Sequence, residues 1–418
     1  MDINELYQIF LHSSGVNTDT RSIRPGQLFV ALKGENFDGN AFAMQALEAG
    51  ACHAVVSDKV PFEDERLTKV PDTLKALQEL AAHHRRQLEI PVIGLTGTNG
   101  KTTTKELIKT VLGAKYRVAA TEGNLNNDIG VPLTVLRIPA DTQIAIVEMG
   151  ASHPEDLKPL LAVAQPTHGL ITNVGKAHLL GFGSFEGVKH AKGLLYDWLK
   201  AHDGVVFANA DDENLQEMLW ERELGCIAYG LDGIKVSSTP FLRLDWADGR
   251  CLETHLVGAY NACNVLAALK IGWFFDVPLE DAMTAVAAYT PSNNRSQLVR
   301  TERNTVIVDA YNANPSSMAV ALDNLALCSG RKVALLGDMR ELGADSAAEH
   351  QKIVARLKGQ EAYLVGEEFT REAQGSGIPC FASSADLAAY LREHPLEGCT
   401  ILVKGSRGTR MEVVIPSL

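Results

Sequence analysis

The 418-residue chain has no run of about 18 apolar residues, so it offers no candidate membrane-spanning helix. It has 51 acidic against 39 basic residues and therefore lacks the basic surface typical of nucleic-acid-binding proteins. Its seven cysteines are scattered, odd in number and without a C-x-x-C pair, which argues against a disulfide or zinc framework. The first residues, MDINELYQIF, lack the basic region and apolar core of a secretory leader. We therefore expect a cytoplasmic protein with reduced thiols, and neither membrane nor nucleic acid as a partner.

A glycine-rich stretch, GLTGTNGKTTTKELI, has the order strand, turn, Gly-Lys-Thr and helix of a phosphate-binding loop, although it lacks the first glycine of a full P-loop. Gly97 and Gly100 allow a tight turn whose N–H groups point inward at a helix N-terminus, where anions are favoured. Lys101 can then reach terminal phosphates, and the hydroxyl of Thr102 or Thr103 can ligate Mg²⁺. An ordinary glycine-rich turn is the alternative. The complete order of the parts favours nucleotide binding.

The chain length and its pattern predict three α/β domains. At 418 residues the chain exceeds what one hydrophobic core usually supports. Apolar runs of strand type alternate with helical periodicity, which indicates mostly parallel sheets covered by helices. We expect a small α/β domain over residues 1–89, a central P-loop-type domain over 90–290, and a doubly wound, Rossmann-like domain over 291–418. Within the central section, FLRLDWADGRCLETHLVG predicts a hairpin that turns at Asp248-Gly249.

Polar residues follow several strands of the central section, where ligands bind in open parallel sheets. Glu148 ends the strand QIAIVE, and a carboxylate beside a phosphate loop is well placed to hold Mg²⁺, although such a residue is otherwise usually solvated. His178 and Lys192 follow in NVGKAHLLGFGSFEGVKHAKG. On spacing alone, they are more often a loop hydrogen-bonding residue and a solvated helix lysine. The segment GNLNNDIGVP offers neutral amides near the site, or an ordinary turn.

The last section presents its own set of strand-end residues. The strand TVIVDA contains Asp309 near its end and leads into AYNANP. The strand KVALLG is followed by Asp338, and the strand TILVKG leads into KGSRG. Acidic, amide and basic groups presented together suggest a site for a second substrate, or for phosphate charge that arrives across a domain cleft. Capped loops are the alternative, with Asn314 before Pro315 simply beginning a helix.

Several of these motifs together resemble one family. GLTGTNGKTT, VEMGA, NVGKAHL, GAYNACN, DAYNANP, LGDMRELG and VKGSRG are similar to the Mur ligases, most closely to the branch that joins D-alanyl-D-alanine to UDP-N-acetylmuramoyl-tripeptide. The shortened loop is this family's own form. The resemblance implies a monomeric ATP-dependent, ADP-forming ligase that acts through an acyl phosphate in peptidoglycan precursor synthesis. Another Mur ligase, a folylpolyglutamate synthase-like ligase and a nucleotide-binding scaffold without catalysis are the alternatives. The domain ahead of the loop and DAYNANP argue against the folate enzyme.

The resemblance also implies roles for individual residues. The nucleotide would contact Gly97, Thr98, Asn99, Gly100, Lys101, Thr102, Thr103, Asn261, Asn264, Arg295 and Asp309. Two Mg²⁺ ions would be held by Thr102, Glu148, His178 and a carbamate formed from CO₂ on Lys192. Lys101, Glu148, His178 and Lys192 would form the catalytic centre. The substrates would contact Thr20, Arg21, Ser22, Asn126, Asn127, Asn312, Asn314, Asp338, Lys404, Ser406 and Arg407. The first domain would hold the UDP-sugar with Thr20, Arg21, Ser22 and the segment 36–39, and the third would swing to close the site.

Overall fold

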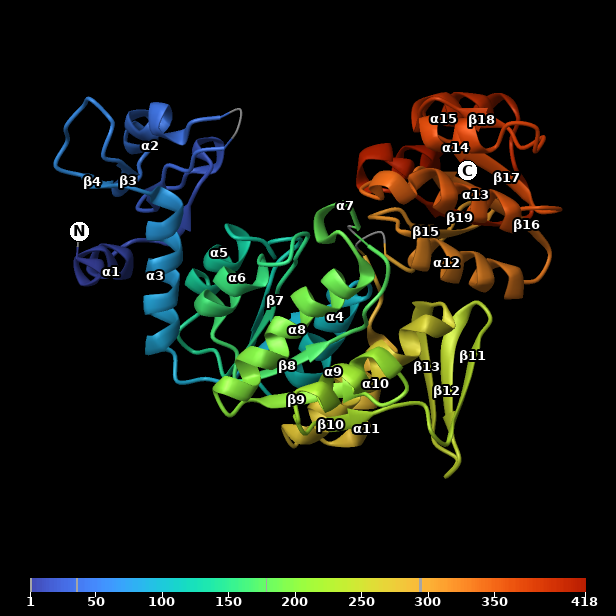
Figure 1. The fold of residues 1–418 in the computed structure, drawn as a ribbon, viewed down its shortest axis with the longest axis horizontal. Coiled ribbons are helices and arrows are strands. Elements are labelled where there is room, and N and C mark those ends of the chain that lie inside the picture. The colour runs from blue at the N-terminus through green and yellow to red at the C-terminus, as the bar shows by residue number, and fades with distance from the viewer. Residues whose placement is uncertain (1, 35–36, 178, 293–294) are drawn as a thin grey trace.

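The computed structural model describes residues 2–34, 37–177, 179–292 and 295–418, arranged in three α/β units (Figure 1). It contains a four-stranded and two six-stranded sheets, together with a small three-stranded sheet. The three larger sheets are parallel, apart from one edge strand. This confirms the predicted α/β class with its central parallel sheet. In the described part of the chain, no helix has the length and apolarity needed to cross a membrane.

The N-terminal unit is built on a parallel sheet in the order β1-β2-β3-β4. Its strands are β1 (Val16–Asn17), β2 (Leu28–Val30), β3 (His53–Ser57) and β4 (Leu67–Val70). Its helices are α1 (Ile3–Leu11), α2 (Ala43–Glu48) and α3 (Thr73–Gln87), with 3-10 turns at Thr20–Ser22 and Gly39–Phe42. Asp72 begins α3 because its carboxylate accepts the main-chain N–H of Lys75. Helix α3 packs against α5 and α6 and so joins this unit to the central one.

The central unit is a six-stranded parallel sheet. Its spatial order is β10 (Ile227–Tyr229), β9 (Val205–Asn209), β8 (His168–Ile171), β5 (Val92–Thr96), β7 (Ile144–Glu148) and β6 (Val118–Ala120). One face is covered by α4 (Lys101–Gly113), α10 (Ala262–Phe274) and α11 (Leu279–Ala288). The other face is covered by α5 (Gly130–Leu136), α6 (Leu157–Ala164), α8 (Phe185–Ala201) and α9 (Glu213–Glu221). A short helix, α7 (Leu179–Phe182), precedes α8.

A three-stranded antiparallel sheet lies beside α10 and below the C-terminal unit in Figure 1. It consists of β11 (Ile234–Ser238), β12 (Phe241–Trp246) and β13 (Cys251–Val257). The predicted hairpin is confirmed, because β12 pairs with β13 and Gly249 adopts a φ of 90° in the connecting turn. A 3-10 turn, Ala259–Asn261, then leads into α10.

The C-terminal unit is a second doubly wound sheet. Its spatial order is β14 (Gln297–Arg300), β15 (Thr305–Asp309), β19 (Cys399–Lys404), β16 (Arg331–Gly337), β17 (Glu361–Val365) and β18 (Cys380–Phe381). One apolar core lies under α12 (Pro315–Leu327), α13 (Ser346–Arg356) and α14 (Glu367–Glu372). The other lies under α15 (Ser384–Glu393) and the last 3-10 turn, Met411–Ser417. Further 3-10 turns are Gly343–Asp345 and Arg407–Thr409.

Candidate active site

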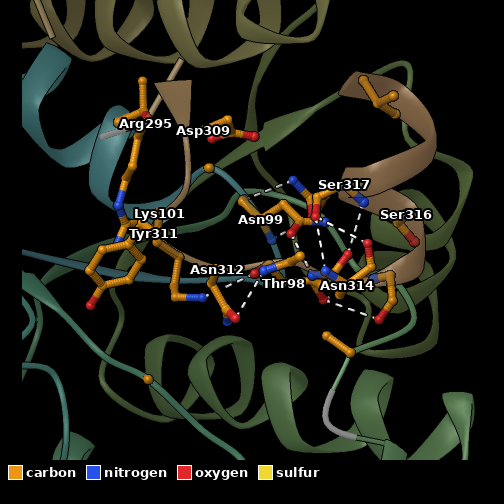
Figure 2. Close-up of a pocket in the computed structure, with 18 of the residues that line it drawn as sticks. Thr98, Asn99, Lys101, Arg295, Asp309, Tyr311, Asn312, Asn314, Ser316 and Ser317 are labelled. Carbon is orange, nitrogen blue, oxygen red and sulfur yellow. Dashed lines mark hydrogen bonds between the residues drawn. The ribbon is translucent and has the colours of Figure 1, made fainter. Parts of the chain in front are cut away.

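A cavity of about 590 Å³ lies between the central and the C-terminal sheets. Figure 2 shows residues of both units around it, with Thr98 and Lys101 from one and Tyr311 and Asn314 from the other. The predicted site residues that line it are Thr98, Asn99, Gly100, Lys101, Thr103, Asn126, Asn127, Glu148, Asn261, Asn264, Arg295, Asp309, Asn312, Asn314 and Lys404. The strand-end motifs of two separate sheets therefore meet in one place.

The phosphate loop connects β5 to α4 through two glycines with positive φ. Gly97 has a φ of 143° and Gly100 a φ of 79°. A Cβ at Gly97 would lie only 2.0 Å from Oγ1 of Thr172, so a larger residue does not fit there. The Lys101 ammonium lies over the loop and donates to the carbonyl oxygens of Gly97 (2.6 Å) and Thr98 (3.2 Å). The loop backbone and this ammonium form a compact, positively charged site.

Burial and nearby charges change the acidity of Lys101. Its pKa is lowered to about 8, mainly by loss of hydration; the Glu148 carboxylate opposes this change and the Arg295 guanidinium adds to it. An anion bound beside this group would favour its protonated form. The loop lysine is therefore suited to hold a phosphate, and without one it loses its proton as the pH rises through about 8.

Glu148 ends β7 and is only 1% exposed. Its carboxylate accepts hydrogen bonds from the Thr102 hydroxyl (2.9 Å) and from the Asn126 amide (2.8 Å). Its main-chain N–H donates to the hydroxyl of Thr121 (2.9 Å), which holds the end of the strand in place. Glu148 is therefore not the solvated glutamate that usually stands at the end of a strand. A carboxylate and a hydroxyl side by side are the oxygen ligands that Mg²⁺ prefers.

Lys192 lies on α8 and is 2% exposed, so the expectation of a solvated helix lysine is wrong. Its ammonium lies 3.4 Å from the carbonyl oxygen of Ala151 and 5.4 Å from the centre of the Phe182 ring. Burial lowers the pKa of Lys192 far below its usual value, and the charge of Lys101 lowers it further. His178 lies outside the described residues. Among the described residues, no three His, Cys, Asp or Glu side chains gather into a metal cluster.

The amides predicted near the nucleotide form a chain behind the loop. Asn264 donates to Oδ1 of Asn261 (2.9 Å) and accepts from the Thr104 hydroxyl (3.0 Å). Asn261 donates to the carbonyl oxygen of Val257 (2.9 Å). Beside them, the Tyr260 hydroxyl is hydrogen-bonded to the Ser296 hydroxyl (2.7 Å). These bonds tie α10 to the start of α4.

The C-terminal unit contributes an ion pair and an aromatic stack. Lys404 donates to the Asp309 carboxylate (2.5 Å) and to the carbonyl oxygen of Asn312 (3.2 Å). The Arg295 guanidinium lies 3.7 Å from the centre of the Tyr311 ring. The guanidinium of Arg407, whose side chain is exposed, lies 5.6 Å from the centre of the same ring. The cations at this edge thus have defined partners.

Two predicted substrate residues, Asp338 and Ser406, do not line the central cavity and are engaged in other contacts. The Asp338 carboxylate accepts the main-chain N–H groups of Glu368 and Phe369 and lines a neighbouring cavity of about 570 Å³. Ser406 accepts the N–H of Arg340 (2.8 Å) and donates to Ala313 (3.3 Å), so it ties two loops together. Their contact with substrate stays a prediction.

The predicted UDP-sugar residues Thr20, Arg21 and Ser22 form a 3-10 turn in the N-terminal unit and do not line the central cavity. Arg21 is 88% exposed and paired with Asp19 (2.7 Å). Residue 36 of the segment expected to hold the sugar lies outside the described residues.

Sequence reasoning missed Asn173, which follows β8 and bonds the main chain of the phosphate loop at Asn99 in two places. Glu148 was found because ligands bind at the carboxyl ends of the strands in an open parallel sheet. The same reasoning applies to Asn173, which follows a strand of the same sheet. Tyr311 was also missed. A tyrosine carries no comparable signal, because its role here depends on two arginines that are distant in sequence.

Comparison with known proteins agrees with this arrangement. Three family models match in order: the Mur ligase family catalytic domain over residues 12–85, the Mur ligase middle domain over 95–272, and the Mur ligase glutamate ligase domain over 294–407. The UDP-N-acetylmuramoyl-tripeptide–D-alanyl-D-alanine ligase of Bacillus subtilis is 35% identical, over 97% of this chain and 93% of its own. The enzyme of the same name from Escherichia coli is 35% identical, over 96% and 93%.

Solved structures show the same architecture over the full length. MurF from Acinetobacter baumannii matches with a TM-score of 0.87 and 29% identity, and covers 100% of this chain and 98% of its own. MurF ligase from Thermotoga maritima, solved in complex with ADP, matches with a TM-score of 0.86 and 26% identity, over 98% and 97%. With the family's three domains in order and relatives matched over nearly their whole length, the chain belongs to the Mur ligase family.

Proposed function

We propose that this protein joins D-alanyl-D-alanine to UDP-N-acetylmuramoyl-tripeptide, with ATP converted to ADP and phosphate. The observation that carries the proposal is the single cavity in which the phosphate loop faces the DAYNANP segment of the C-terminal unit. Relatives that carry this name match nearly the whole chain. The product would be a UDP-linked pentapeptide, a precursor of peptidoglycan. Both substrates are small molecules.

ATP would bind with its phosphates on the loop from Gly97 to Thr103, where Lys101 balances their charge. The amides of Asn261 and Asn264 would lie toward the base. Arg295 and Asp309 would approach the nucleotide from the C-terminal side of the cavity. These placements are supported by the distribution of the residues around one cavity.

Mg²⁺ fits the pair formed by Thr102 and Glu148, because both present oxygen and Glu148 is shielded from water. His178 would complete the ligands. When bound, the metal ions would balance the negative charge that develops on the transferring phosphoryl group.

A carbamate fits Lys192 for a separate reason. Only a neutral amine adds CO₂, and burial favours that neutral form. The resulting anion would lie near the Lys101 cation, which now disfavours a second positive charge there. Lys192 would thereby change from a cation into a carboxylate-like ligand beside the metal ions.

The reaction requires activation, since a carboxylate is a poor electrophile. The γ-phosphoryl group of ATP would pass to the terminal carboxylate of the tripeptide, giving an acyl phosphate and ADP. The neutral amine of the dipeptide would then attack the acyl carbon, and the tetrahedral intermediate would expel phosphate. Lys101 and the loop N–H groups would stabilise the transferring group, where a single donor is typically worth about 10² to 10³ in rate. The cavity between two units would limit hydrolysis of the acyl phosphate by water.

The UDP end of the substrate would extend toward the N-terminal unit, with Thr20, Arg21 and Ser22. The peptide would run past Asn126, Asn127, Asn312, Lys404, Ser406 and Arg407. We place the reaction in the cytoplasm, in keeping with seven cysteines that are all free thiols.

The test is phosphate release from ATP and Mg²⁺ with UDP-N-acetylmuramoyl-tripeptide, with and without D-alanyl-D-alanine. We expect release that depends on the dipeptide, and a UDP-pentapeptide product by mass spectrometry. Tripeptides ending in diaminopimelate and in lysine should both be tried. Phosphate release with folate and glutamate, but not with these substrates, would refute the proposal.

A further inference from the structure

Asn314 uses its side-chain amide in two directions. Its Oδ1 accepts the N–H of Ser317 (2.9 Å), and the Ser317 hydroxyl is bonded in return to the main chain of Asn314, so the pair caps α12. Its Nδ2 donates to Oδ1 of Asn99 in the phosphate loop at 2.8 Å, a direct contact between the two units at the wall of the cavity (Figure 2). The cap determines which way the amide points, so the N–H that faces Asn99 is not free to turn away.

Asn99 is held on its other side by the central unit. Its N–H donates to Oδ1 of Asn173 (3.0 Å), and its carbonyl oxygen accepts from the Thr172 hydroxyl (2.6 Å) and from Asn173 Nδ2 (3.0 Å). Its two neighbours in the loop have other roles, because the Thr98 carbonyl oxygen accepts from the Lys101 ammonium and Gly100 is the N-cap of α4. A shift of Asn99 would therefore move the residues on which Lys101 rests.

The helix that begins after Asn314 is anchored in the core of the C-terminal unit. Pro315 occupies the first turn of α12, and Met318, Leu322 and Leu325 of the same helix are buried in the C-terminal core. The start of α12 therefore cannot move without the whole C-terminal unit. The Asn314–Asn99 bond links the position of one domain to the shape of the phosphate loop of the other.

We propose that Asn314 is a positioning residue that couples docking of the C-terminal unit to the conformation of the phosphate loop. This inference rests on the proposed ligase function and replaces the substrate contact expected for Asn314. Docking of the unit completes the cavity and at the same moment adds the bond from Asn314 to the Asn99 side chain, which further restrains the loop under Lys101. The reaction would then begin only with a correctly shaped loop and a closed cavity.

The test separates capping from coupling. Asn314→Ser keeps a good N-cap but loses the amide N–H, whereas Asn314→Ala loses both. Asn324→Ser is the matched control, since Asn324 lies on the same helix and contacts Ser238 of the central unit away from the loop. Hydrogen–deuterium exchange of the full-length protein would be followed at residues 97–103 and at the start of α12.

For Asn314→Ser we expect exchange in the loop to rise about five- to tenfold, as for loss of one hydrogen bond, with α12 still protected. The control should stay within about twofold of the wild type in both segments. In the ligase assay, kcat/KM for ATP should fall about five- to tenfold. Asn99→Ala combined with Asn314→Ser should be no worse than Asn99→Ala alone, because both changes remove one bond.

Unchanged loop exchange in Asn314→Ser would overturn the inference, as would equal acceleration in Asn324→Ser or effects that multiply in the double variant. The exchange measurements need no substrate. A wild-type protein without ligase activity would therefore refute the proposed function, while the coupling would still be decided by the exchange rates.

Discussion

Nucleotide affinity should weaken as the pH rises above about 8, and this follows from the burial of one side chain. Lys101 has its pKa lowered to about 8 in the unliganded protein, mainly by loss of hydration, with Glu148 opposing this and Arg295 adding to it. Phosphate binds the protonated ammonium, and the neutral amine offers it no charge. Binding above that pH must therefore be accompanied by uptake of a proton.

The magnitude follows from one titrating group. With a pKa of about 8, the apparent Kd for ADP is multiplied by a factor of one plus ten to the power of the pH minus 8. The factor is about 1.1 at pH 7 and about 11 at pH 9, so the Kd should rise about tenfold between them. A lysine with its usual pKa of about 10.4 would change the Kd by only a few per cent over the same range.

Isothermal titration with ADP and Mg²⁺ at several pH values tests this directly, and buffers of different ionisation enthalpy report the proton uptake. Lys101→Arg serves as the control, because a guanidinium stays charged throughout this range. Its Kd is expected to be weaker but flat with pH. A wild-type Kd that is constant between pH 7 and pH 9 would refute the assigned protonation of Lys101.

Three further outcomes are expected. Gly97→Ala should lower the free energy of unfolding by about 2 to 4 kcal/mol and abolish ADP binding, because its Cβ would overlap Thr172. Gly113→Ala, at an open position of α4, is the control, and in thermal unfolding it should change the free energy of unfolding by less than about 1 kcal/mol. Asn304→Ala should cost the C-terminal unit about 2 to 4 kcal/mol in urea unfolding, because this buried amide serves three main-chain groups, and a change under about 0.5 kcal/mol would contradict that reading. Lys192→Ala should lose at least about a hundredfold in activity, with partial rescue by short carboxylates, and should lack the carbamate carbon signal that we expect the wild type to give with ¹³C-bicarbonate. Full activity in Lys192→Ala would exclude the carbamate.

Several features could be predicted because their causes are local in sequence. The phosphate loop was recognisable since Gly97, Gly100 and Lys101 are neighbours, and only their order matters. Glu148 was recognisable because it ends an apolar strand beside that loop. The structure confirms both positions. By contrast, β14 and β18 were missed. The first is an antiparallel edge strand of four residues and the second has only two, so neither leaves a clear periodic pattern.

Other features depend on contacts that no local pattern reports. Lys192 looked like an ordinary exposed lysine, and its burial results from packing of α8 beneath the loop that carries Ala151. The bond between Asn99 and Asn314 joins residues 215 positions apart. The stack of Arg295 on Tyr311 likewise depends on how the third unit is placed.

The sequence alone therefore determined the α/β class, the phosphate loop and the strand ends where polar groups gather, because glycine conformations and strand periodicity are properties of neighbouring residues. Tertiary structure decided which of those groups share a cavity and in which protonation state they stand. Hydration and nearby charge set the pKa of Lys101 and Lys192, and both depend on segments that are distant in sequence and meet only when the chain packs, with Arg295 of the C-terminal unit acting on Lys101.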